Sequence, residues 1–417
     1  MRQPNSDKGA QVIIQGHSIG NMDAVDYHKY KSTAMSFALE SYERLAASYD
    51  LVIVEGAGSP AEINLRENDV ANMGFATAAH CPVLLVADID RGGVFAHLKG
   101  TLDCLSEEER SLVKGTVINR FRGDKALLDS GIDWLEQNTG IPTIGVLPYL
   151  QGLHIEAEDA VANESRNGAT DQNLKVVVPR IPRISNHTDF DVLRMHPRVD
   201  LRFISAGEQI PAADLIILPG SKSTIQDLNW LFENGWQPVL QKHLRYGGKM
   251  IGICGGYQMI GKQVHDPDGL EGPPDSLDGF GLLDFETTLV PRKTLLNVTG
   301  TLTIDGSRVT GYEIHMGQSS GPDLDTAAID LDGRKDGVIS SDNQILCSYL
   351  HGLFDHQEAC SSLLNWAGLD NADSFDYDQF RQNEIDRVAD MLEGHLDNAL
   401  MQQILFPEEP RIDAASA

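Results

Sequence analysis

The chain has 417 residues, of which 41% are hydrophobic, and a formal net charge of −28. This length suits two domains of ordinary size, each with its own core. The negative charge disfavours nucleic acids and anionic membranes as partners, and no apolar run approaches the length of a membrane span. Five cysteines without Cys-x-x-Cys spacing argue against a disulfide framework or a zinc site and, with no apolar leader, predict a cytoplasmic protein.

Residues 1–155 are predicted to form an α/β domain with a parallel sheet. An amphipathic helix is expected over residues 27–49, because apolar residues recur there at helical spacing. Four apolar runs separated by helix-length segments are expected to be the strands of the sheet: 51–55, 82–88, 115–119 and 143–147. Ligands of such sheets bind at the carboxyl ends of the strands, so the polar residues at those ends are the candidate binding residues.

Acidic and amide side chains at these strand ends suit a nucleotide and its metal ion. Glu55 closes its strand before a glycine turn and is expected to hold Mg²⁺ as a Walker B carboxylate does, the alternative being a carboxylate that caps a helix. Asp88 and Asp90 follow the next strand and can bind phosphate, metal or a substrate carboxylate. Asn119 ends the third strand and suits the edge of a nucleobase.

Arginines near the same strand ends are expected to bind anions, because a guanidinium matches the geometry of carboxylate and phosphate groups. Arg91 follows the second strand, and Arg120 and Arg122 follow the third. Arg66 lies in the segment after the first strand. These residues are the candidate substrate-binding cations of the domain.

Residues 156–173 are polar, acidic and weakly patterned, and are predicted to be a linker between domains. A second α/β domain is predicted over residues 174–362, followed by a helical extension over residues 363–417 that contains an amphipathic helix at 376–402. The second domain is expected to contain strands at 175–178, 201–204, 215–218 and 250–253, with a β-rich portion over 280–317.

The strongest chemical signal is Cys254, between a predicted strand and a predicted helix. Glycines on either side allow a sharp turn that lifts the sulfur clear of the sheet. The helix N-terminus favours the thiolate, and the amide of Gly255 is well placed to donate to an oxyanion. By itself the turn is equally compatible with a buried structural cysteine.

Residues at two further strand ends, together with this cysteine, predict an acyl-transfer site. The strand 215–218 runs into a loop at Gly220 that can supply a second oxyanion amide. His351 follows a strand much later in the chain, as expected of a general base that meets its nucleophile only in the fold. His187 and Asp189 either contact substrate or form a domain interface, and the residues alone leave both open.

Four segments of this second domain resemble a known family: 218–222, 252–258, 311–317 and 349–354. They look like the class I glutamine amidotransferase domain of the cobyric acid synthase and cobyrinate diamide synthase group. The resemblance implies that Cys254 attacks the carboxamide of glutamine, that His351 is the base, and that ammonia passes to a second site. It also makes His315 a residue near the site.

One position departs from the wider class. In most class I glutaminases a glutamate two residues after the histidine orients it, and here that position is Leu353. The cobyric acid synthase group is known for lacking this glutamate, so the departure supports the narrower resemblance. It implies that another group, which the sequence does not identify, orients His351.

The first domain resembles the synthetase half of the same group through three segments: 55–59, 88–96 and 117–124. That half is similar in fold to dethiobiotin synthetase and to partitioning ATPases. The resemblance implies ATP and Mg²⁺, and a polycarboxylate corrinoid, adenosylcobyrinic acid a,c-diamide, that the arginines would hold. Residues 90–93 and the run to Leu150 favour the cobyric acid synthase branch over the diamide synthase branch.

The P-loop of this synthetase fold does not occur in the sequence. No Gly-x-x-x-x-Gly-Lys-Ser/Thr is present, and residues 220–224 match only the end of that pattern. Residues 5–14 look like an internal stretch of the family, so we expect a truncated P-loop-NTPase-like domain. A remnant with glutaminase activity only, or with none, is therefore an alternative to the complete ligase.

Overall fold

The computed structural model describes residues 2–4, 9–67, 69–155, 173–331, 333–370 and 375–406. The chain divides into two compact units, residues 1–153 with 383–417 and residues 154–382. Of the predicted linker, residues 156–172 lie outside the described residues. No helix among the described residues combines the length and apolar character needed to cross a membrane.

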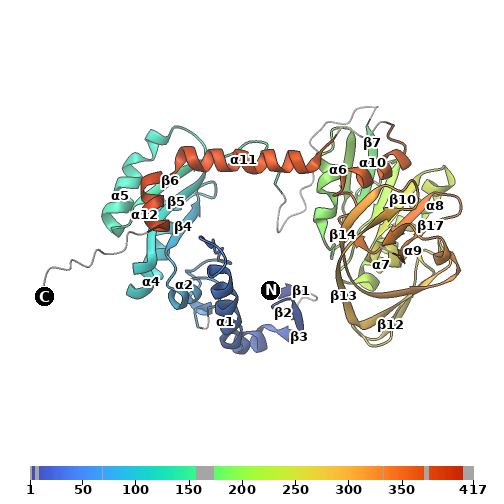
Figure 1. Cartoon of the computed structure of the whole chain (residues 1–417), viewed down its shortest axis with the longest axis horizontal. Coiled ribbons are helices and arrows are strands. Elements are labelled where there is room, and N and C mark those ends of the chain that lie inside the picture. The colour runs from blue at the N-terminus through green and yellow to red at the C-terminus, as the bar shows by residue number, and fades with distance from the viewer. Residues whose placement is uncertain are drawn as a thin grey trace, which may run out of the picture. The chain divides into compact units, whose positions relative to one another are not determined.

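The first unit contains a parallel sheet in the order β4 (Val83–Asp88), β5 (Val113–Phe121) and β6 (Thr143–Pro148) (Figure 1). These strands confirm three of the four predicted ones. Its helices are α2 (Met73–Ala79), α3 (Val94–Cys104), α4 (Glu107–Leu112) and α5 (Asp129–Thr139), with short 3₁₀ turns η1 (Ile63–Leu65) and η2 (Lys125–Leu127).

Successive side chains of β5 face opposite sides of this sheet. Ile118 packs with residues of α3 and α5. Val117, its neighbour, packs with residues of the C-terminal helices α11 (Tyr377–His395) and α12 (Asn398–Leu405). The predicted C-terminal helical extension therefore supplies one cover of the first sheet, and Gly145 of β6 leaves room for it, since an added Cβ would lie 2.7 Å from the carbonyl oxygen of His395.

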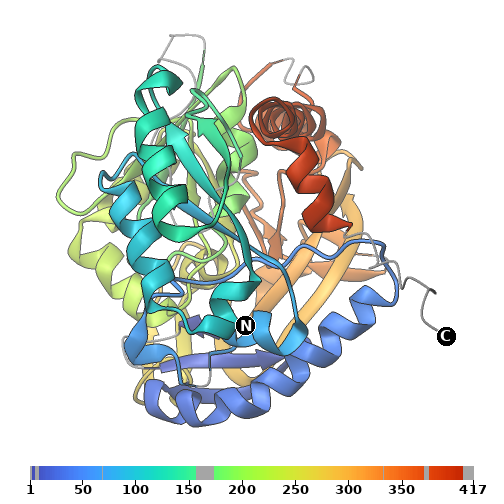
Figure 2. The same ribbon diagram turned by 90° about the vertical axis from the view of Figure 1, so that its left-hand side faces the viewer.

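An antiparallel sheet and a long helix precede these elements in the same unit. The sheet has the order β1 (Arg2–Pro4), β2 (Gly9–Ile14) and β3 (His17–Asp23). The predicted amphipathic helix is α1 (Ala24–Ala46), drawn in blue along the lower edge of the unit in Figure 2.

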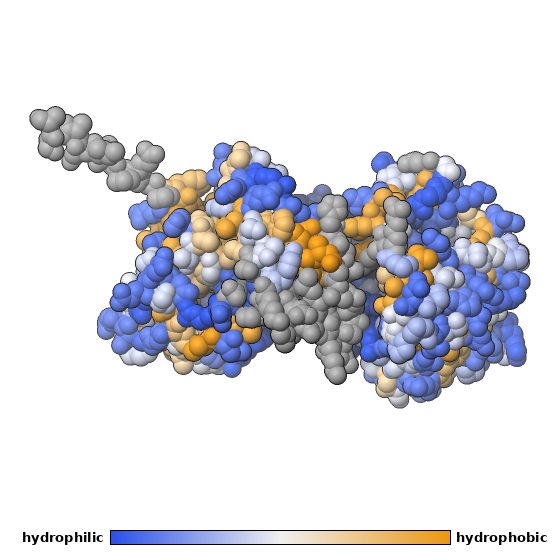
Figure 3. All heavy atoms as spheres, turned by 90° about the horizontal axis from the view of Figure 1, so that it is seen from below, coloured by the Kyte–Doolittle hydropathy of each residue, from blue (hydrophilic) through white to orange (hydrophobic). Residues whose placement is uncertain are grey.

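The predicted strand over residues 51–55 is wrong, because residues 51–57 form no strand. Ile53 is 87% exposed, and Leu51 and Val54 are exposed as well. A strand requires a hydrogen-bonding neighbour, and among the described residues β4 pairs only with β5. The apolar character of residues 51–55 therefore did not suffice to make them a strand. Figure 3 shows apolar surface (orange) on this unit.

The second unit is built on a six-stranded sheet in the order β17-β18-β10-β9-β7-β8, parallel except for β17. Four of these strands confirm predictions. Their bounds are β17 (Val338–Ile339), β18 (Ile345–Ser348), β10 (Lys249–Ile253), β9 (Leu215–Leu218), β7 (Leu174–Pro179) and β8 (Val199–Ile204). The strands are buried along nearly their whole length, as expected of a parallel sheet covered on both faces.

Helices and a second sheet surround this core (Figure 1). The helices are α6 (Asp191–Met195), α7 (Thr224–Glu233), α8 (Trp236–Arg245), α9 (Gly255–Ile260) and α10 (Gln357–Trp366), with 3₁₀ turns η3 (His187–Phe190) and η4 (Pro322–Asp325). The second sheet consists of β11 (Gln263–Asp266), β12 (Asp275–Asp278), β13 (Glu286–Leu302), β14 (Arg308–Ser320), β15 (Ile329–Leu331), β16 (Arg334–Asp336) and β19 (Leu350–His351).

Two matched substitutions in the first unit test the corrected strand. Ile118→Ala should lower the free energy of unfolding by about 2–5 kcal/mol, because it leaves a cavity under β5. Ile53→Ala should change it by less than about 0.5 kcal/mol, because the side chain already faces solvent. Urea unfolding of both variants measures the difference, and a loss of several kcal/mol in Ile53→Ala would show that residues 51–55 are packed after all.

Candidate functional site

Cys254 occupies a strained turn between β10 and α9. Its backbone has φ 50° and ψ −106°, a region that a non-glycine residue adopts only where its surroundings enforce it. Gly256 makes the turn possible, since an added Cβ there would lie 2.1 Å from the carbonyl oxygen of Leu218 in β9. The cysteine, 5% exposed, thus stands at the tip of a strand–turn–helix elbow typical of a catalytic nucleophile.

His351 reaches the same place from the neighbouring strand. β18 pairs with β10 so that Ser348 lies beside Ile253, and the chain then continues three residues to the histidine. Its ring stacks on that of Tyr312, with 5.5 Å between centroids. Within the described part of the chain, the buried Nε2 has no hydrogen-bond partner.

Asp189 is the group that orients His351. Its Oδ2 lies 2.7 Å from Nδ1 of the imidazole, and its Oδ1 accepts a hydrogen bond of 2.9 Å from the amide of Gly352. The carboxylate is 2% exposed and sits on η3, which follows β7 in the chain. Sequence reasoning singled out this segment but left Asp189 between two other roles, because only the fold brings it to the histidine.

The charge of Asp189 governs the protonation of the histidine. Burial of the imidazole by itself would lower its pKa, but the Asp189 carboxylate and the neighbouring Cys254 raise the pKa of His351 to about 10. His351 therefore holds its proton at neutral pH. A cationic imidazolium next to a cysteine is the arrangement that stabilises a thiolate.

The glycine loop after β9 closes around these two residues. An added Cβ on Gly220 would lie 3.0 Å from Cε1 of His351, and one on Gly255 would lie 2.7 Å from the amide nitrogen of Ser221. The loop is held by the amide of Ser185, which donates to the carbonyl of Gly220 over 2.9 Å. The structure therefore brings together the four residues predicted for this site; the oxyanion role of Gly220 and Gly255 stays a prediction.

β14 forms another wall of the site. The thiol of Cys254 lies 3.7 Å from the carbonyl oxygen of Ile314. His315, the next residue, binds the carbonyl of Gly317 through Nδ1 at 2.9 Å and stacks on Tyr349 with 3.8 Å between ring centroids. Burial lowers the pKa of His315, so a neutral imidazole supports Tyr349, two residues before the histidine of the site.

In the first unit the predicted acidic and basic residues meet at the ends of β4 and β5. Arg120 binds Asp88 at 3.1 Å and Asp90 at 3.5 Å, and Arg122 binds Asp90 at 3.3 Å. The guanidinium of Arg122 lies 3.6 Å from the centroid of the Tyr149 ring, a cation–π contact. Arg120 has a φ of 64°, so the backbone here is strained as well.

The remaining predicted residues of this unit are placed differently. The side-chain oxygen of Asn119 accepts a hydrogen bond of 2.8 Å from the amide of Arg120. Arg91 is largely exposed, with its Nε 3.9 Å from Asp88. Arg66 binds Glu109 and the carbonyl of Cys104, which corrects its expected role as a free anion-binding cation.

Glu55 is exposed and lies outside the helices and strands of the described part of the chain. Its predicted position at a strand end does not exist, since the strand is not formed. The described residues also contain no group of three or more His, Cys, Asp or Glu side chains arranged to hold a metal ion. The proposal that Glu55 holds Mg²⁺ thus has no support from neighbouring ligands.

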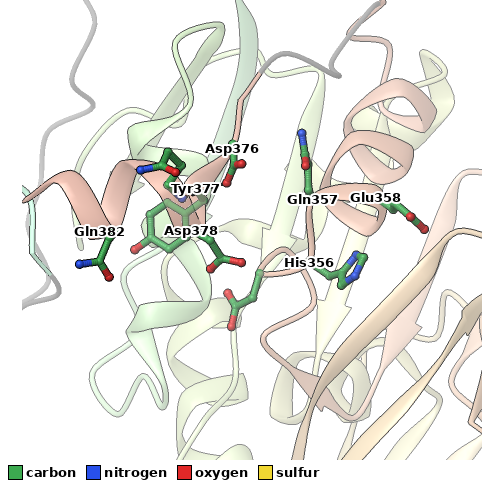
Figure 4. Close-up of a pocket in the computed structure, with 9 residues that line it drawn as sticks. His356, Gln357, Glu358, Asp376, Tyr377, Asp378 and Gln382 are labelled. Atoms are coloured by element: carbon green, nitrogen blue, oxygen red, sulfur yellow. Dashed lines mark hydrogen bonds between the residues drawn. The ribbon is translucent and has the colours of Figure 1, made fainter.

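The second unit has a hollow of about 430 Å³ that is separate from the nucleophile (Figure 4). Four carboxylates line it, from Asp355, Glu358, Asp376 and Asp378, together with His356, Gln357, Tyr377, Gln379 and Gln382. Its lining includes neither Cys254 nor His351. The hollow and the turn of Cys254 are therefore different places in the unit.

Two family models match the chain. Residues 175–359 match the CobB/CobQ-like glutamine amidotransferase domain, and residues 21–157 match an AAA domain. The fold is thus a parallel-sheet AAA-like domain, followed by a glutamine amidotransferase domain and C-terminal helices. The amidotransferase match includes the turn with Cys254 and also includes His351 and Asp189.

Solved structures with a limited likeness include PurLQS from Thermotoga maritima, at 15% identity and a TM-score of 0.34, covering 51% of this chain and 99% of that one. A glutamine amidotransferase structure matches at 17% identity and a TM-score of 0.35, covering 46% of this chain and 98% of that one. Another from Thermotoga maritima matches at 11% identity and a TM-score of 0.30, covering 56% of this chain and 99% of that one.

Asp189→Asn tests the role of the buried carboxylate. Loss of the negative charge should lower the pKa of His351, so that the imidazolium is less populated near pH 7. Alkylation of Cys254 by iodoacetamide at that pH should slow by about tenfold or more. Mass spectrometry of the Cys254 peptide measures the rate.

The control for this variant is Asp200→Asn, which removes another buried carboxylate, one paired with Arg202 at 3.0 Å. It should leave the alkylation rate of Cys254 unchanged. Equal rates in wild type and Asp189→Asn at pH 7 would mean that Asp189 does not control the histidine.

Proposed function

Taking an AAA domain followed by a CobB/CobQ-like glutamine amidotransferase domain as the premise, we propose that the chain releases ammonia from glutamine at Cys254 and transfers it to carboxylates activated by ATP. The observation that carries this proposal is the arrangement of Cys254, His351 and Asp189. A strained cysteine, a histidine and a buried carboxylate have the roles of nucleophile, general acid–base and positioning group.

The residues support the following sequence of steps. Sγ of Cys254 attacks the carboxamide carbon of glutamine, and the resulting oxyanion accepts hydrogen bonds from the amide of Gly255 and from the Gly220–Ser221 loop. His351 gives its proton to the departing nitrogen, the C–N bond breaks, and ammonia and a glutamyl thioester form. Water, deprotonated by His351, then attacks the thioester and releases glutamate.

For the acceptor we propose a corrinoid, with the activity of a cobyric acid synthase. The b, d, e and g carboxylates of adenosylcobyrinic acid a,c-diamide would take the γ-phosphoryl group of ATP, with release of ADP. Ammonia would then attack the acyl carbon and expel inorganic phosphate, which leaves the amide. Arg120, Arg122 and Arg91 would hold substrate carboxylates, with Asp88 and Asp90 nearby for Mg²⁺-ATP. Their meeting at the carboxyl ends of β4 and β5 supports this, since ligands of parallel sheets bind at such ends. Asn119 would complete the nucleotide contacts.

Two alternative activities can be distinguished from the proposed one. A cobyrinate a,c-diamide synthase would amidate other carboxylates of the same kind of corrinoid, and the position of the new amides separates the two. Glutamine hydrolysis without amidation is favoured by one observation, the exposed Glu55 outside any strand.

Cys254→Ala should abolish glutamine-dependent amidation and leave ammonia-dependent amidation intact, because only the first needs the thioester. The purified chain is incubated with Mg-ATP, the corrinoid and either glutamine or an ammonium salt, and the product is analysed by mass spectrometry. Glutamine use equal to wild type would refute Cys254 as the nucleophile. Glutamate release without amidation from either nitrogen source would favour the glutaminase alternative.

Arg122→Ala should raise the KM for the corrinoid by about tenfold or more, because a charge-assisted contact is lost. Arg122→Lys should recover little, since lysine reproduces neither the planar fork nor the stacking on Tyr149. Lys114→Ala removes a cation from the opposite end of β5 and serves as the control. A KM unchanged in Arg122→Ala would exclude this arginine from substrate binding.

A further inference from the structure

A loop in the second unit places a carboxylate close to the turn of the nucleophile. It connects β11 with β12 and is fastened by Asp266, which accepts hydrogen bonds from the amides of Leu270 at 2.7 Å and Glu271 at 2.9 Å. The Glu271 carboxylate accepts hydrogen bonds from the amide of Ile225 and the hydroxyl of Thr224, both at 3.3 Å. Glu271 is thereby fixed at the N-terminus of α7.

Short contacts connect Glu271 with Cys254. The hydroxyl of Thr224 lies 3.1 Å from Oε1 of Gln258, which is buried in α9. Gln258 is one helical turn beyond the nucleophile, since its amide donates to the carbonyl of Cys254 over 3.1 Å. Thr224 also directly follows the loop whose Ser221 lies against Gly255. Two residues, Thr224 and Gln258, thus connect the Glu271 carboxylate with the backbone of the nucleophile.

The charge of Glu271 is left without a counter-ion. Burial raises the pKa of Glu271 to about 7, the bonds from Ile225 and Thr224 only partly oppose this, and the neighbouring Asp266 adds repulsion. Among the described residues, the groups that contact its carboxylate are the amide of Ile225 and the hydroxyl of Thr224, and no cation acts on its pKa. A carboxylate held away from water is costly unless a cation joins it.

We infer that Glu271 binds the α-ammonium group of glutamine and so determines which amide the site accepts. The inference rests on the proposed glutamine hydrolysis. When the carboxamide carbon of glutamine is at Sγ of Cys254, its ammonium group lies one side-chain length away and needs an anion there. Glu271 is a carboxylate connected with the nucleophile through Thr224 and Gln258, and binding of an ammonium group would favour its charged form, whereas a plain amide without that group would gain nothing from it. The competing explanation is that Glu271 only caps α7.

The test compares Glu271→Gln with wild type on two substrates, using the full chain. L-glutamine carries the ammonium group, and glutaramate (4-carbamoylbutanoate) lacks only that group. Glu271→Gln removes the charge and keeps one oxygen, which can accept from the amide of Ile225, while its NH₂ group can donate to the hydroxyl oxygen of Thr224. The kcat/KM for ammonia release from glutamine should fall by about 10- to 100-fold, mainly through KM, because a hydrogen bond to a charged group is lost. The kcat/KM for glutaramate should not fall.

Glu233→Gln is the matched control, because it removes an exposed carboxylate from the other end of α7 and should leave both values unchanged. A second measurement is labelling of Cys254 by 6-diazo-5-oxo-L-norleucine, which carries the ammonium group, and by iodoacetamide, which does not. Only the first should slow in Glu271→Gln.

The outcomes separate the two proposals. If wild type neither releases ammonia from glutamine nor is labelled by the diazo analogue, the proposed function fails and the inference with it. If wild type is active and Glu271→Gln loses the same factor on both substrates, or none, the inference alone is overturned. An equal loss on both substrates with a lower Tm would mean that Glu271 acts only as the cap of α7.

Discussion

The catalytic arrangement depends on three neighbouring parallel strands that end together. β9, β10 and β18 lie side by side, with Leu218 beside Gly252 and Ile253 beside Ser348. Hydrogen-bonded register between parallel strands leaves little freedom, so the glycine loop, the cysteine and the histidine strand emerge at one edge of the sheet. Residues far apart in the chain are thus positioned by backbone pairing, and the side chains need only short reaches to meet.

Electrostatics then sets the chemical state of that edge. Asp189 and His351 are both nearly inaccessible to water, where an ion pair is favourable only with well-placed hydrogen bonds. The second oxygen of Asp189 is bound by the amide of Gly352, which meets this condition. The pair lets a neutral-pH imidazolium exist beside a thiol. In the same unit the Glu271 carboxylate is held differently, by hydrogen bonds from the uncharged groups of Thr224 and Ile225.

Local sequence predicted what local physics determines. The elbow at Cys254 and the buried strands around it depend on glycines and apolar runs, and both formed as expected. Asp189 could not be assigned, because the signal for a positioning carboxylate is its distance from His351, which only the tertiary fold creates. The prediction of a strand at residues 51–55 was wrong because local sequence is not sufficient for a strand. These apolar residues were compatible with a strand, but strand formation depends on a neighbour that the sequence of the segment does not encode.

The C-terminal helices carry a consequence for how this protein is made. α11 and α12 cover the Val117 face of the first sheet with residues from Met391 onward. These residues leave the ribosome only after the whole of residues 154–382. The second unit is an insertion within the first, and it can fold cotranslationally while the first still exposes an uncovered apolar face. During synthesis that face is a target for aggregation and for chaperones. Completion of the first unit therefore has to wait until the whole second unit has been synthesised.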